Sequence, residues 1–436
     1  MRGIGIKLGY RVAAALAALL IFAGAFAPAA SAQTFKRIHF FCHTDGCPDG
    51  QSPTSALVRD QSGNLFGTTG TGGLHGGGTV FEMSPGKNAW KYKVLYSFCS
   101  EANCADGRGP YGGVILDSAG NMYGTTTGGG GALDAGVLFE LVNTGGTLTM
   151  RVLHDFCSEG GGSCTDGFEP NSALTYAGAS AGLPYDGTSP LYGTTQQQGG
   201  NVAGTAFAYE QREHGRKHVL RTLHRFCART NCADGSTPGG LALDAGGNLF
   251  GTTHTRGGGG AGTLFEIGAD GRFSLLYTFC SAANCTDGGE PYAGVHIDAV
   301  GNLYGTTDVG GAQDAGVVYE LRNDRGAPQF SVLHDFCSFA DCADGSHPRA
   351  GVIADADGNL YGVTTTGGGI NGRGFFGVLY KLNGAYTVLH TFDQKSRGQD
   401  GNNPTGGLLL DPQETIYGTT QNGGRFLGGT VFALTP

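Results

Sequence analysis

The chain has 436 residues, of which 82 are glycine and 15 are proline, and its formal net charge at pH 7 is −9. This acidic balance argues against a nucleic-acid-binding protein, because phosphate backbones are bound by clustered Lys and Arg, and it also argues against docking on anionic lipid. The glycine and proline content approaches that of disordered chains. Apolar phrases nevertheless recur at regular intervals, so we expect most of the glycine to lie in turns and loops.

Residues 1–32 have the organisation of a secretory signal peptide. Three basic residues precede a mostly apolar stretch from 12 to 26, and Ala30-Ser31-Ala32 is a small-residue cleavage site. The apolar stretch is short for a bilayer crossing, and no Cys follows the cut, so neither membrane insertion nor a lipid anchor is expected. We predict export to the periplasm or the extracellular space after cleavage near Ala32, which changes the net charge from −9 to −12 because three positive charges are removed.

The rest of the chain is a tandem repeat. An aromatic residue followed by Gly and usually Thr-Thr occurs seven times, at spacings of 57, 69, 58, 54, 57 and 56 residues. A fixed period of this length is typical of stacked supersecondary units. The aromatic residues are Phe66, Tyr123, Tyr192, Phe250, Tyr304, Tyr361 and Tyr417.

Each repeat is predicted to contain four strands, which we name a to d. In the copy at 111–156 the runs 112–117, 121–126, 136–141 and 150–156 are rich in β-branched and aromatic residues and are bounded by Gly, Asn, Asp or Ser. These runs have no helical period, so they are typical of strands. Seven units of four short antiparallel strands predict an all-β protein, a seven-bladed β-propeller.

The two ends of the repeat region predict how the ring closes. The mature chain opens with 35–41, which aligns with strand d, and finishes with 429–434, which aligns with strand c. The N-terminal strand is therefore expected to complete the last blade, which removes two exposed sheet edges. An open solenoid is the alternative. The predicted blades are 51–98, 109–156, 169–226, 237–279, 290–336 and 347–392, and finally 404–436 together with 33–41.

The repeated phrases resemble a known family. The runs 240–244 (GLALD), 247–253 (GNLFGTT) and 262–267 (GTLFEI) resemble the Gloeo-Verruco (GloVer) tandem repeat of choice-of-anchor proteins, over residues 35–436. A weaker similarity connects them to NHL-like and virginiamycin-lyase-like β-propellers. The resemblance implies an exported β-propeller with no settled activity. We expect no cofactor, and calcium is the alternative. This chain departs from the family pattern in its cysteine pairs and in having no C-terminal anchor.

The twelve cysteines form six pairs, each between a strand d and the next strand a. Evenly spaced Cys in an exported chain indicate disulfides, and equivalent points on neighbouring blades are too far apart for a bond, so pairing is expected within each loop. A zinc site is the alternative. The predicted disulfides are Cys42–Cys47, Cys99–Cys104, Cys157–Cys164, Cys227–Cys232, Cys280–Cys285 and Cys337–Cys342.

Two polar positions recur around the predicted ring. Every unit has an Asp-Gly after the Cys pair, which is typical turn chemistry; the alternative is a carboxylate ring near the channel mouth that holds calcium or a hydroxyl-rich ligand. Strand d carries His in five units and Tyr in two, and we interpret it as a packed, hydrogen-bonded aromatic rather than a metal ligand. The Asp residues are Asp49, Asp106, Asp166, Asp234, Asp287, Asp344 and Asp400. The aromatic residues are His39, His154, His224, His334 and His390, with Tyr96 and Tyr277.

The Thr-Thr pairs on strand b are interpreted as cross-strand hydrogen-bonding residues. They have no adjacent base, and no nucleophile elbow, HExxH, Walker loop or dinucleotide fingerprint occurs in the chain. The sequence therefore offers no catalytic residues.

Because neighbouring strands of a blade run in opposite directions, the b–c loop and the connection from strand d to the next strand a emerge on the same face, which we call the loop rim. Loops on a rigid scaffold commonly carry function. Units that break the repeat pattern suggest where a ligand binds. Aromatic side chains beside planar donors suit sugar or peptide recognition, and simple loop packing is the alternative. The candidate ligand-binding residues are His254, Arg256, Arg373, Phe375, Phe376, Arg425 and Phe426.

Three functions remain open at this point. The first is a non-catalytic binding module for a carbohydrate or protein ligand, favoured because seven similar rims share no catalytic set. The second is a propeller enzyme, a lyase or a glycan-active protein, with a site at the channel mouth. The third is a structural cell-surface protein. The oligomeric state has no sequence signature.

Overall fold

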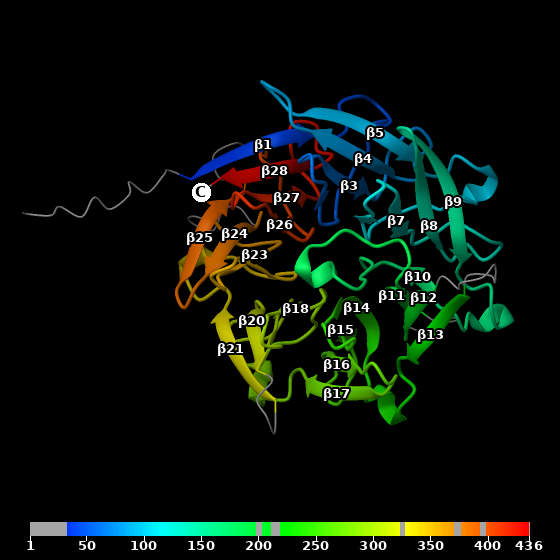
Figure 1. The fold of residues 1–436 in the computed structure, drawn as a ribbon. Coiled ribbons are helices and arrows are strands. Elements are labelled where there is room, and N and C mark those ends of the chain that lie inside the picture. Colours follow the sequence, from blue (N-terminus) through cyan, green and yellow to red (C-terminus); the bar gives the residue numbers. More distant parts are fainter. Residues whose placement is uncertain are drawn as a thin grey trace, which may run out of the picture. The chain divides into compact units, whose positions relative to one another are not determined.

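The computed structural model describes residues 33–197, 203–210, 219–322, 328–369, 376–392 and 398–435. Within these ranges, 28 strands form seven four-stranded antiparallel sheets arranged as a ring (Figure 1). The predicted all-β, seven-bladed β-propeller is confirmed. No helix among the described residues has the length and hydropathy that a bilayer crossing requires.

The seven blades follow one another along the chain. Blade 1 contains β2 (Val58–Arg59), β3 (Leu65–Thr69), β4 (Thr79–Ser84) and β5 (Lys91–Ser97). Blade 2 contains β6 (Val114–Leu116), β7 (Met122–Thr125), β8 (Val137–Thr144) and β9 (Thr147–Asp155). Blade 3 contains β10 (Phe168–Pro170), β11 (Leu191–Gln197), β12 (Thr205–Glu210) and β13 (Val219–Arg225). Blade 4 contains β14 (Ser236–Leu243), β15 (Leu249–Thr255), β16 (Thr263–Ile267) and β17 (Phe273–Thr278).

The remaining blades repeat this pattern. Blade 5 contains β18 (His296–Ile297), β19 (Leu303–Thr307), β20 (Val317–Arg322) and β21 (Gln329–Asp335). Blade 6 contains β22 (Ile353–Ala354), β23 (Leu360–Val363), β24 (Val378–Leu382) and β25 (Tyr386–Thr391). Blade 7 contains β26 (Leu409–Leu410), β27 (Ile416–Thr420), β28 (Thr430–Thr435) and β1 (Thr34–Phe40). Short 3-10 turns occur at Ala102–Cys104, Gly161–Ser163, Ala179–Ala181, Thr230–Cys232, Ala283–Cys285 and Ala340–Cys342.

The N-terminal strand completes the last blade, as predicted. β1 pairs antiparallel with β28, from Thr34 opposite Thr435 to Phe40 opposite Thr430, and the two strands lie side by side in Figure 1. On the inner side, the Thr419 hydroxyl donates a hydrogen bond to the Ser55 carbonyl at 3.2 Å, which connects blade 7 to blade 1. The ring is therefore closed by backbone pairing at the outside and by a blade-to-blade hydrogen bond nearer the channel.

The Gly and the second Thr of the repeated aromatic-Gly-Thr-Thr phrase have separate structural roles. A Cβ at Gly124 would lie 2.7 Å from the Phe139 ring, so glycine is needed where the aromatic residue of the next strand covers the sheet. The second Thr bonds across the sheet, as predicted: the hydroxyls of Thr69 and Thr79 are 2.9 Å apart. These contacts give the recurring phrase a structural role in each blade.

The hydrophobic core lies between neighbouring blades rather than in one central mass. Between blades 7 and 1, for example, Phe41, Phe81 and Val431 are fully buried in one cluster with Leu65. Similar clusters occur around the ring among the described residues. Because each blade packs only on its neighbours, the ring can exceed the size of an ordinary single core.

The b–c loops and the d–a connections share one rim, as predicted. In blade 1, the N–H of Gln51 donates to the Thr71 carbonyl at 2.8 Å, and the N–H of Gly73 donates to the Cys47 carbonyl at 2.9 Å. The insertion 177–189 in blade 3 instead extends the turn between strands a and b. Its Tyr185 N–H donates to the Leu116 carbonyl at 2.8 Å, so the insertion packs against blade 2 and leaves the loop rim open.

Candidate functional site

A proline shared by all seven units organises the channel mouth on the loop rim. It lies four residues after the Asp of each Asp-Gly, and its ring packs on a glycine of the preceding blade; a Cβ at Gly316, for example, would lie 2.8 Å from Pro348 Cδ. Sequence reasoning missed this signal, although it is visible once the units are aligned. The prolines are Pro53, Pro110, Pro170, Pro238, Pro291, Pro348 and Pro404.

The residue before each of these prolines has a left-handed backbone. Residues before proline normally adopt extended conformations, yet six non-glycine residues here have φ between 51° and 57°. A hydrogen bond to the preceding blade holds this geometry: the His347 N–H donates to the Ala315 carbonyl at 2.8 Å, and the Glu290 N–H donates to the Ala261 carbonyl at 2.7 Å. Strained backbone of this kind is concentrated at functional sites. The six residues are Ser52, Glu169, Thr237, Glu290, His347 and Asn403, with Gly109 in the seventh unit.

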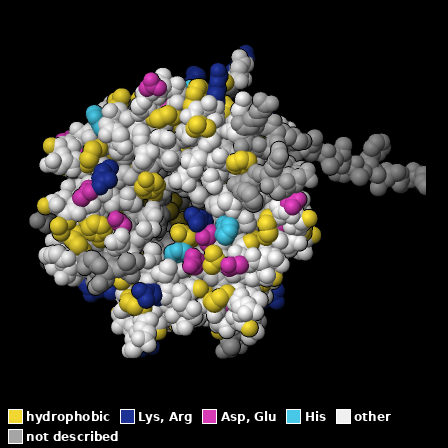
Figure 2. All heavy atoms as spheres, turned by 180° about the vertical axis from the view of Figure 1, so that it is seen from behind, with side chains coloured by type: hydrophobic (Ala, Val, Ile, Leu, Met, Phe, Trp, Pro, Cys, Tyr) yellow, Lys and Arg dark blue, Asp and Glu magenta, His cyan; other side chains and the backbone are white. Residues whose placement is uncertain are grey.

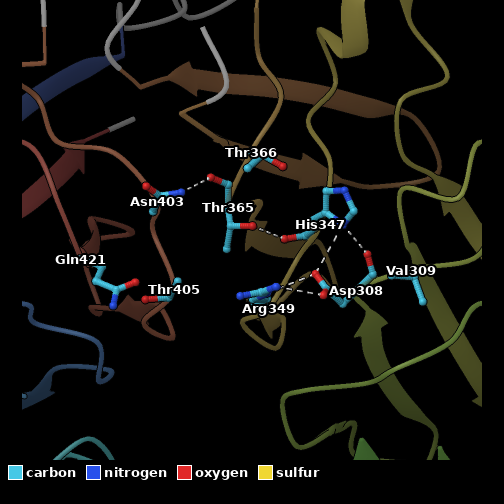
Figure 3. Close-up of a pocket in the computed structure, with 9 residues that line it drawn as sticks. All are labelled: Asp308, Val309, His347, Arg349, Thr365, Thr366, Asn403, Thr405 and Gln421. Carbon is cyan, nitrogen blue, oxygen red and sulfur yellow. Dashed lines mark hydrogen bonds and ion pairs between the residues drawn. The ribbon is translucent and has the colours of Figure 1, made fainter. Parts of the chain in front are cut away.

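A cavity of about 280 Å³ opens at this mouth between blades 5, 6 and 7. Its wall combines residues from the b–c loops with residues on either side of the shared proline (Figure 3). Side chains from three blades therefore meet at one point, although they are far apart in sequence. The lining residues are Asp308, Val309, His347, Arg349, Thr365, Thr366, Asn403, Thr405 and Gln421.

An ion pair forms one side of the cavity. Both Arg349 Nε and Nη2 donate to the Asp308 carboxylate, at 3.3 and 3.2 Å. His347 Nδ1 lies 2.9 Å from the Asp308 carbonyl oxygen, and because a carbonyl only accepts, Nδ1 carries the proton. Burial acts to raise the pKa of Asp308, but hydrogen bonds from His347 and Arg349 outweigh it and hold that pKa below its ordinary value. The carboxylate in turn raises the pKa of His347.

The charged side chains continue into blade 4. The Arg349 guanidinium lies 5.0 Å from the centre of the Tyr292 ring, the His254 ring is 3.9 Å from Tyr292, and His254 Nε2 is 3.9 Å from the Glu290 carboxylate. Burial lowers the pKa of His254. The two histidines of this region therefore have opposite pKa shifts. We name the following set the charged arc: His254, Glu290, Tyr292, Asp308, His347 and Arg349.

Uncharged side chains line the part of the mouth formed by blades 6, 7 and 1. Asn403 Nδ2 donates to the Thr365 carbonyl at 3.0 Å, and the Thr365 hydroxyl donates to the His347 carbonyl at 2.6 Å. Figure 2 shows the hollowed centre of this face, with basic, acidic and histidine side chains gathered beside the hollow. Amide and hydroxyl groups thus face a charged, aromatic wall. We name the following set the neutral arc: Ser52, Thr54, Asn403, Thr405 and Gln421.

The residues predicted to bind a ligand lie in different surroundings. His254 belongs to the charged arc, and Arg256 is exposed in the same b–c loop, where its N–H donates to the Gly260 carbonyl at 3.1 Å. Arg425 lies 5.4 Å above the Phe426 ring, and Phe426 is 4.8 Å from the His43 ring.

The remaining predicted residues lie around blades 6 and 7. Phe376 packs against the hydrophobic cluster between these two blades. Arg373 and Phe375 lie outside the described residues. Among the described members of the predicted set, only His254 lies in the charged arc.

The Asp-Gly carboxylates lie behind the disulfide loops and pair with strand d. Asp166, fully buried, accepts hydrogen bonds from His154 Nε2 at 2.9 Å and from the Ser158 N–H at 3.1 Å. In blade 1 the Tyr96 hydroxyl donates to Asp106 at 2.8 Å in the same way. All six predicted disulfides are present in these loops. The recurring Asp and the recurring His or Tyr are thus hydrogen-bonded to each other in six of the seven pairs, and the exception is His39 with Asp49, at 3.8 Å.

Sequence reasoning did not single out Glu290, Tyr292, Asp308, His347 or Arg349. The repeat alignment could have found them. All five occupy positions beside the shared proline or directly after the Thr-Thr phrase, where the side chains differ between units; Glu290 and Tyr292 have identical counterparts only in Glu169 of unit 3 and Tyr111 of unit 2. Equivalent positions with divergent chemistry are thus the signal that locates this site.

Comparison with protein families gives one match. A model described as the Gloeobacter/Verrucomicrobia repeat matches residues 24–189 and 273–436. No curated protein sequence matches the chain.

The chain is similar to solved structures at low sequence identity, and in the first of the two below the likeness extends to the fold. The extracellular domain of a proposed one-component system from B. thetaiotaomicron is 11% identical with a TM-score of 0.51, over 91% of this chain and 39% of that one. PorZ, a surface component of the type-IX secretion system of Porphyromonas gingivalis, is 12% identical with a TM-score of 0.41, over 82% of this chain and 44% of that one. The chain thus spans less than half the length of either, and at these identities the likeness concerns the fold alone.

Proposed function

The chain belongs to the Gloeobacter/Verrucomicrobia repeat family, and from this premise we propose that it is an exported binding protein that takes a hydroxyl-rich saccharide at the channel mouth. Six disulfides support an oxidising compartment outside the cytoplasm. The predicted signal peptide at 1–32 lies outside the described residues and supplies the export route in this proposal.

The observation that carries the proposal is the asymmetry of the mouth. The seven blades share one backbone, yet the charged arc lies on blades 4 to 6 and the neutral arc on blades 6, 7 and 1. A purely structural ring would not need different chemistry at equivalent positions. Selective binding does need it, because a ligand is recognised by a few convergent polar groups on a mostly preformed wall.

The residue types favour a saccharide over a peptide or a phosphorylated ligand. Tyr292, whose ring is in contact with Arg349 and His254, is 40% exposed at the mouth, and the amides and hydroxyls of the neutral arc suit hydroxyl groups. Arg349 is already paired with Asp308, so its charge is largely balanced and a dianionic phosphate is disfavoured. A cavity of about 280 Å³ is near the lower limit for small ligands, so we expect one or two sugar rings.

A second candidate is an enzyme acting at the same place. It is favoured by the two histidines, because burial lowers the pKa of His254 while Asp308 raises that of His347. Groups whose pKa values are displaced in opposite directions can serve as a base and an acid. Under this alternative, the bound saccharide is cleaved or eliminated, and His347→Gln abolishes turnover while binding is retained.

The test is a glycan array with the chain from residue 33 to 436, followed by calorimetry on any saccharide that binds. We expect Arg349→Gln and Tyr292→Ala each to weaken binding at least about tenfold, the scale of a lost key contact. Tyr111→Ala is the matched control, because Tyr111 occupies the position of Tyr292 in blade 2 and belongs to neither arc, and it should leave affinity unchanged. No saccharide binding, or binding that both mouth variants retain, would contradict the proposal.

A further inference from the structure

One disulfide loop carries a histidine at a position where the other five carry a small side chain. Directly after the first Cys, four loops carry a serine whose hydroxyl bonds to the Asp, as Ser158 does to Asp166 at 3.2 Å, and a fifth carries Ala228. In the Cys42–Cys47 loop, this position is His43. A second imidazole therefore stands beside the His–Asp pair only in this loop of the described ring. The residues at this position are His43, Ser100, Ser158, Ala228, Ser281 and Ser338.

The extra histidine changes the geometry of the pair. His43 Nδ1 lies 2.8 Å from Asp49 Oδ2, and His39 Nε2 lies 3.8 Å from the same oxygen. The corresponding distance is 2.9 Å for His154 and 3.1 Å for His334. His39 Nε2 is buried without a hydrogen-bond partner, and its side chain is 10% exposed. One donor atom from each of the three residues lies within 4.8 Å of the others.

Neighbouring groups hold these side chains in place. The His39 ring stacks on Tyr92 at 3.9 Å and meets Phe41 edge-on at 4.7 Å. Asp49 Oδ1 accepts the Cys42 N–H at 3.0 Å, and the Tyr92 hydroxyl donates to the Asp49 carbonyl. Imidazoles oriented by a supporting outer layer of contacts are what metal sites use.

We propose that His39 Nε2, His43 Nδ1 and the Asp49 carboxylate bind one divalent transition-metal ion, with Zn²⁺ as the first candidate. Two donors, each about 2.0–2.1 Å from a tetrahedral zinc, lie roughly 3.4 Å apart, and the observed separations of 2.8 and 3.8 Å from Asp49 lie on either side of that value. Two imidazoles and one carboxylate favour Zn²⁺ over Ca²⁺, which prefers oxygen ligands.

The position gives the ion a structural consequence. His39 belongs to β1, the strand that closes the ring, whereas His43 and Asp49 belong to the connection that leads into blade 1. The His43 side chain is 48% exposed, so the fourth coordination position faces solvent and the ion has an entry path. A bound ion would tie the closing strand to the first blade, and it should raise the melting temperature.

The experiment is a calorimetric titration of the metal-free chain 33–436, its disulfides intact, with ZnCl₂. We expect one Zn²⁺ ion to bind tightly per chain and the melting temperature to rise by a few degrees. His43→Ser and His39→Tyr should each abolish this binding and the rise. Both replacements occur naturally at the equivalent positions of other blades, so folding should be retained, and a melt without metal checks this. The matched control is His154→Tyr, the same replacement in a loop that has no second histidine, and it should bind zinc like the parent chain.

Co²⁺ substitution supplies a second readout that does not depend on stability. A tetrahedral site of mixed nitrogen and oxygen ligands gives intense visible absorption bands, which His43→Ser should remove. The proposal is overturned if the parent chain binds no zinc. It is equally overturned if His39→Tyr and His43→Ser retain the tight zinc binding, or if His154→Tyr loses it as they do, because the binding would then be adventitious.

Discussion

The disulfide loops and the channel mouth belong to the same d–a connections, yet they use repetition in opposite ways. At the disulfide loops the side chains themselves recur: a Cys pair, an Asp and a strand-d His or Tyr join into one hydrogen-bonded unit. At the mouth, the backbone recurs and the side chains diverge. Repeated side chains in this ring therefore belong to the scaffold, whereas the repeated backbone with variable side chains is where we propose a recognition surface.

The largest expected effect on stability comes from the core that both regions share. Phe81 is fully buried between blades 7 and 1, so Phe81→Ala removes packing and leaves a cavity. We expect the free energy of unfolding to fall by about 3–5 kcal/mol, measured by urea denaturation. A loss below about 1 kcal/mol would mean that blade packing is not what holds the ring.

The next effect concerns the buried carboxylates behind the disulfide loops. Asp344 accepts hydrogen bonds from His334 Nε2 at 3.1 Å and from the Ser338 hydroxyl and N–H at 2.8 and 3.0 Å. Asp344→Asn keeps the size of the side chain but removes its charge. It also replaces one accepting oxygen by an NH₂ group, which would face a hydrogen-bond donor. We expect a loss of about 1–3 kcal/mol in the free energy of unfolding, detected by thermal and urea melts. If the melting temperature and the free energy of unfolding of Asp344→Asn were unchanged, this Asp would not have the structural role assigned to it.

The same carboxylates predict an acid dependence of stability. Burial acts to raise the pKa of Asp344, but hydrogen bonds from His334 and Ser338 outweigh it and lower that pKa; Asp166 is lowered in the same way through His154. A lowered pKa in the folded state contributes stability above the unfolded-state pKa of about 3.9, and this contribution is lost as the pH falls through the folded-state value. Unfolding free energies measured from pH 6 to pH 3 should therefore decline below about pH 4, and less steeply in Asp344→Asn.

A single disulfide should matter less. Replacing both Cys227 and Cys232 by Ser opens a loop of six residues, for which chain entropy predicts a loss of about 2 kcal/mol. The seventh unit carries no cysteine at all, so the ring should still form. Thermal melts with and without reductant check this. If the chain failed to fold without this one disulfide, the disulfide would do more than cross-link its own loop.

The smallest stability effect is expected at the mouth. Tyr292 is 40% exposed, so Tyr292→Ala should change the free energy of unfolding by no more than about 1 kcal/mol, while saccharide binding falls at least tenfold as proposed above. The pairing of Phe81→Ala with Tyr292→Ala thus tests the comparison directly. If Tyr292→Ala were as destabilising as Phe81→Ala, the mouth would belong to the scaffold.

Much of the fold follows from local patterns. The four runs per unit, the closing strand at 35–41 and the six cysteine pairs were all predictable, because each depends on short segments and on their order in the chain. The candidate functional site was harder to predict from the sequence. Phe376 and Phe426 were predicted as one patch because their loops are neighbours, but Phe376 turns into the core cluster between blades 6 and 7, whereas Phe426 packs on His43.

By itself, the sequence determined the number of blades, the way the ring closes and the pairing of the cysteines, since a periodic pattern repeats the same local physics seven times. Only the tertiary structure decided which side chains meet. Asp308 and Arg349 are 41 residues apart, and the unpartnered nitrogen of His39 faces Asp49 across a loop whose conformation depends on the blade behind it. Such meetings depend on the ring geometry and on the direction of each side chain, neither of which is encoded in any single repeat.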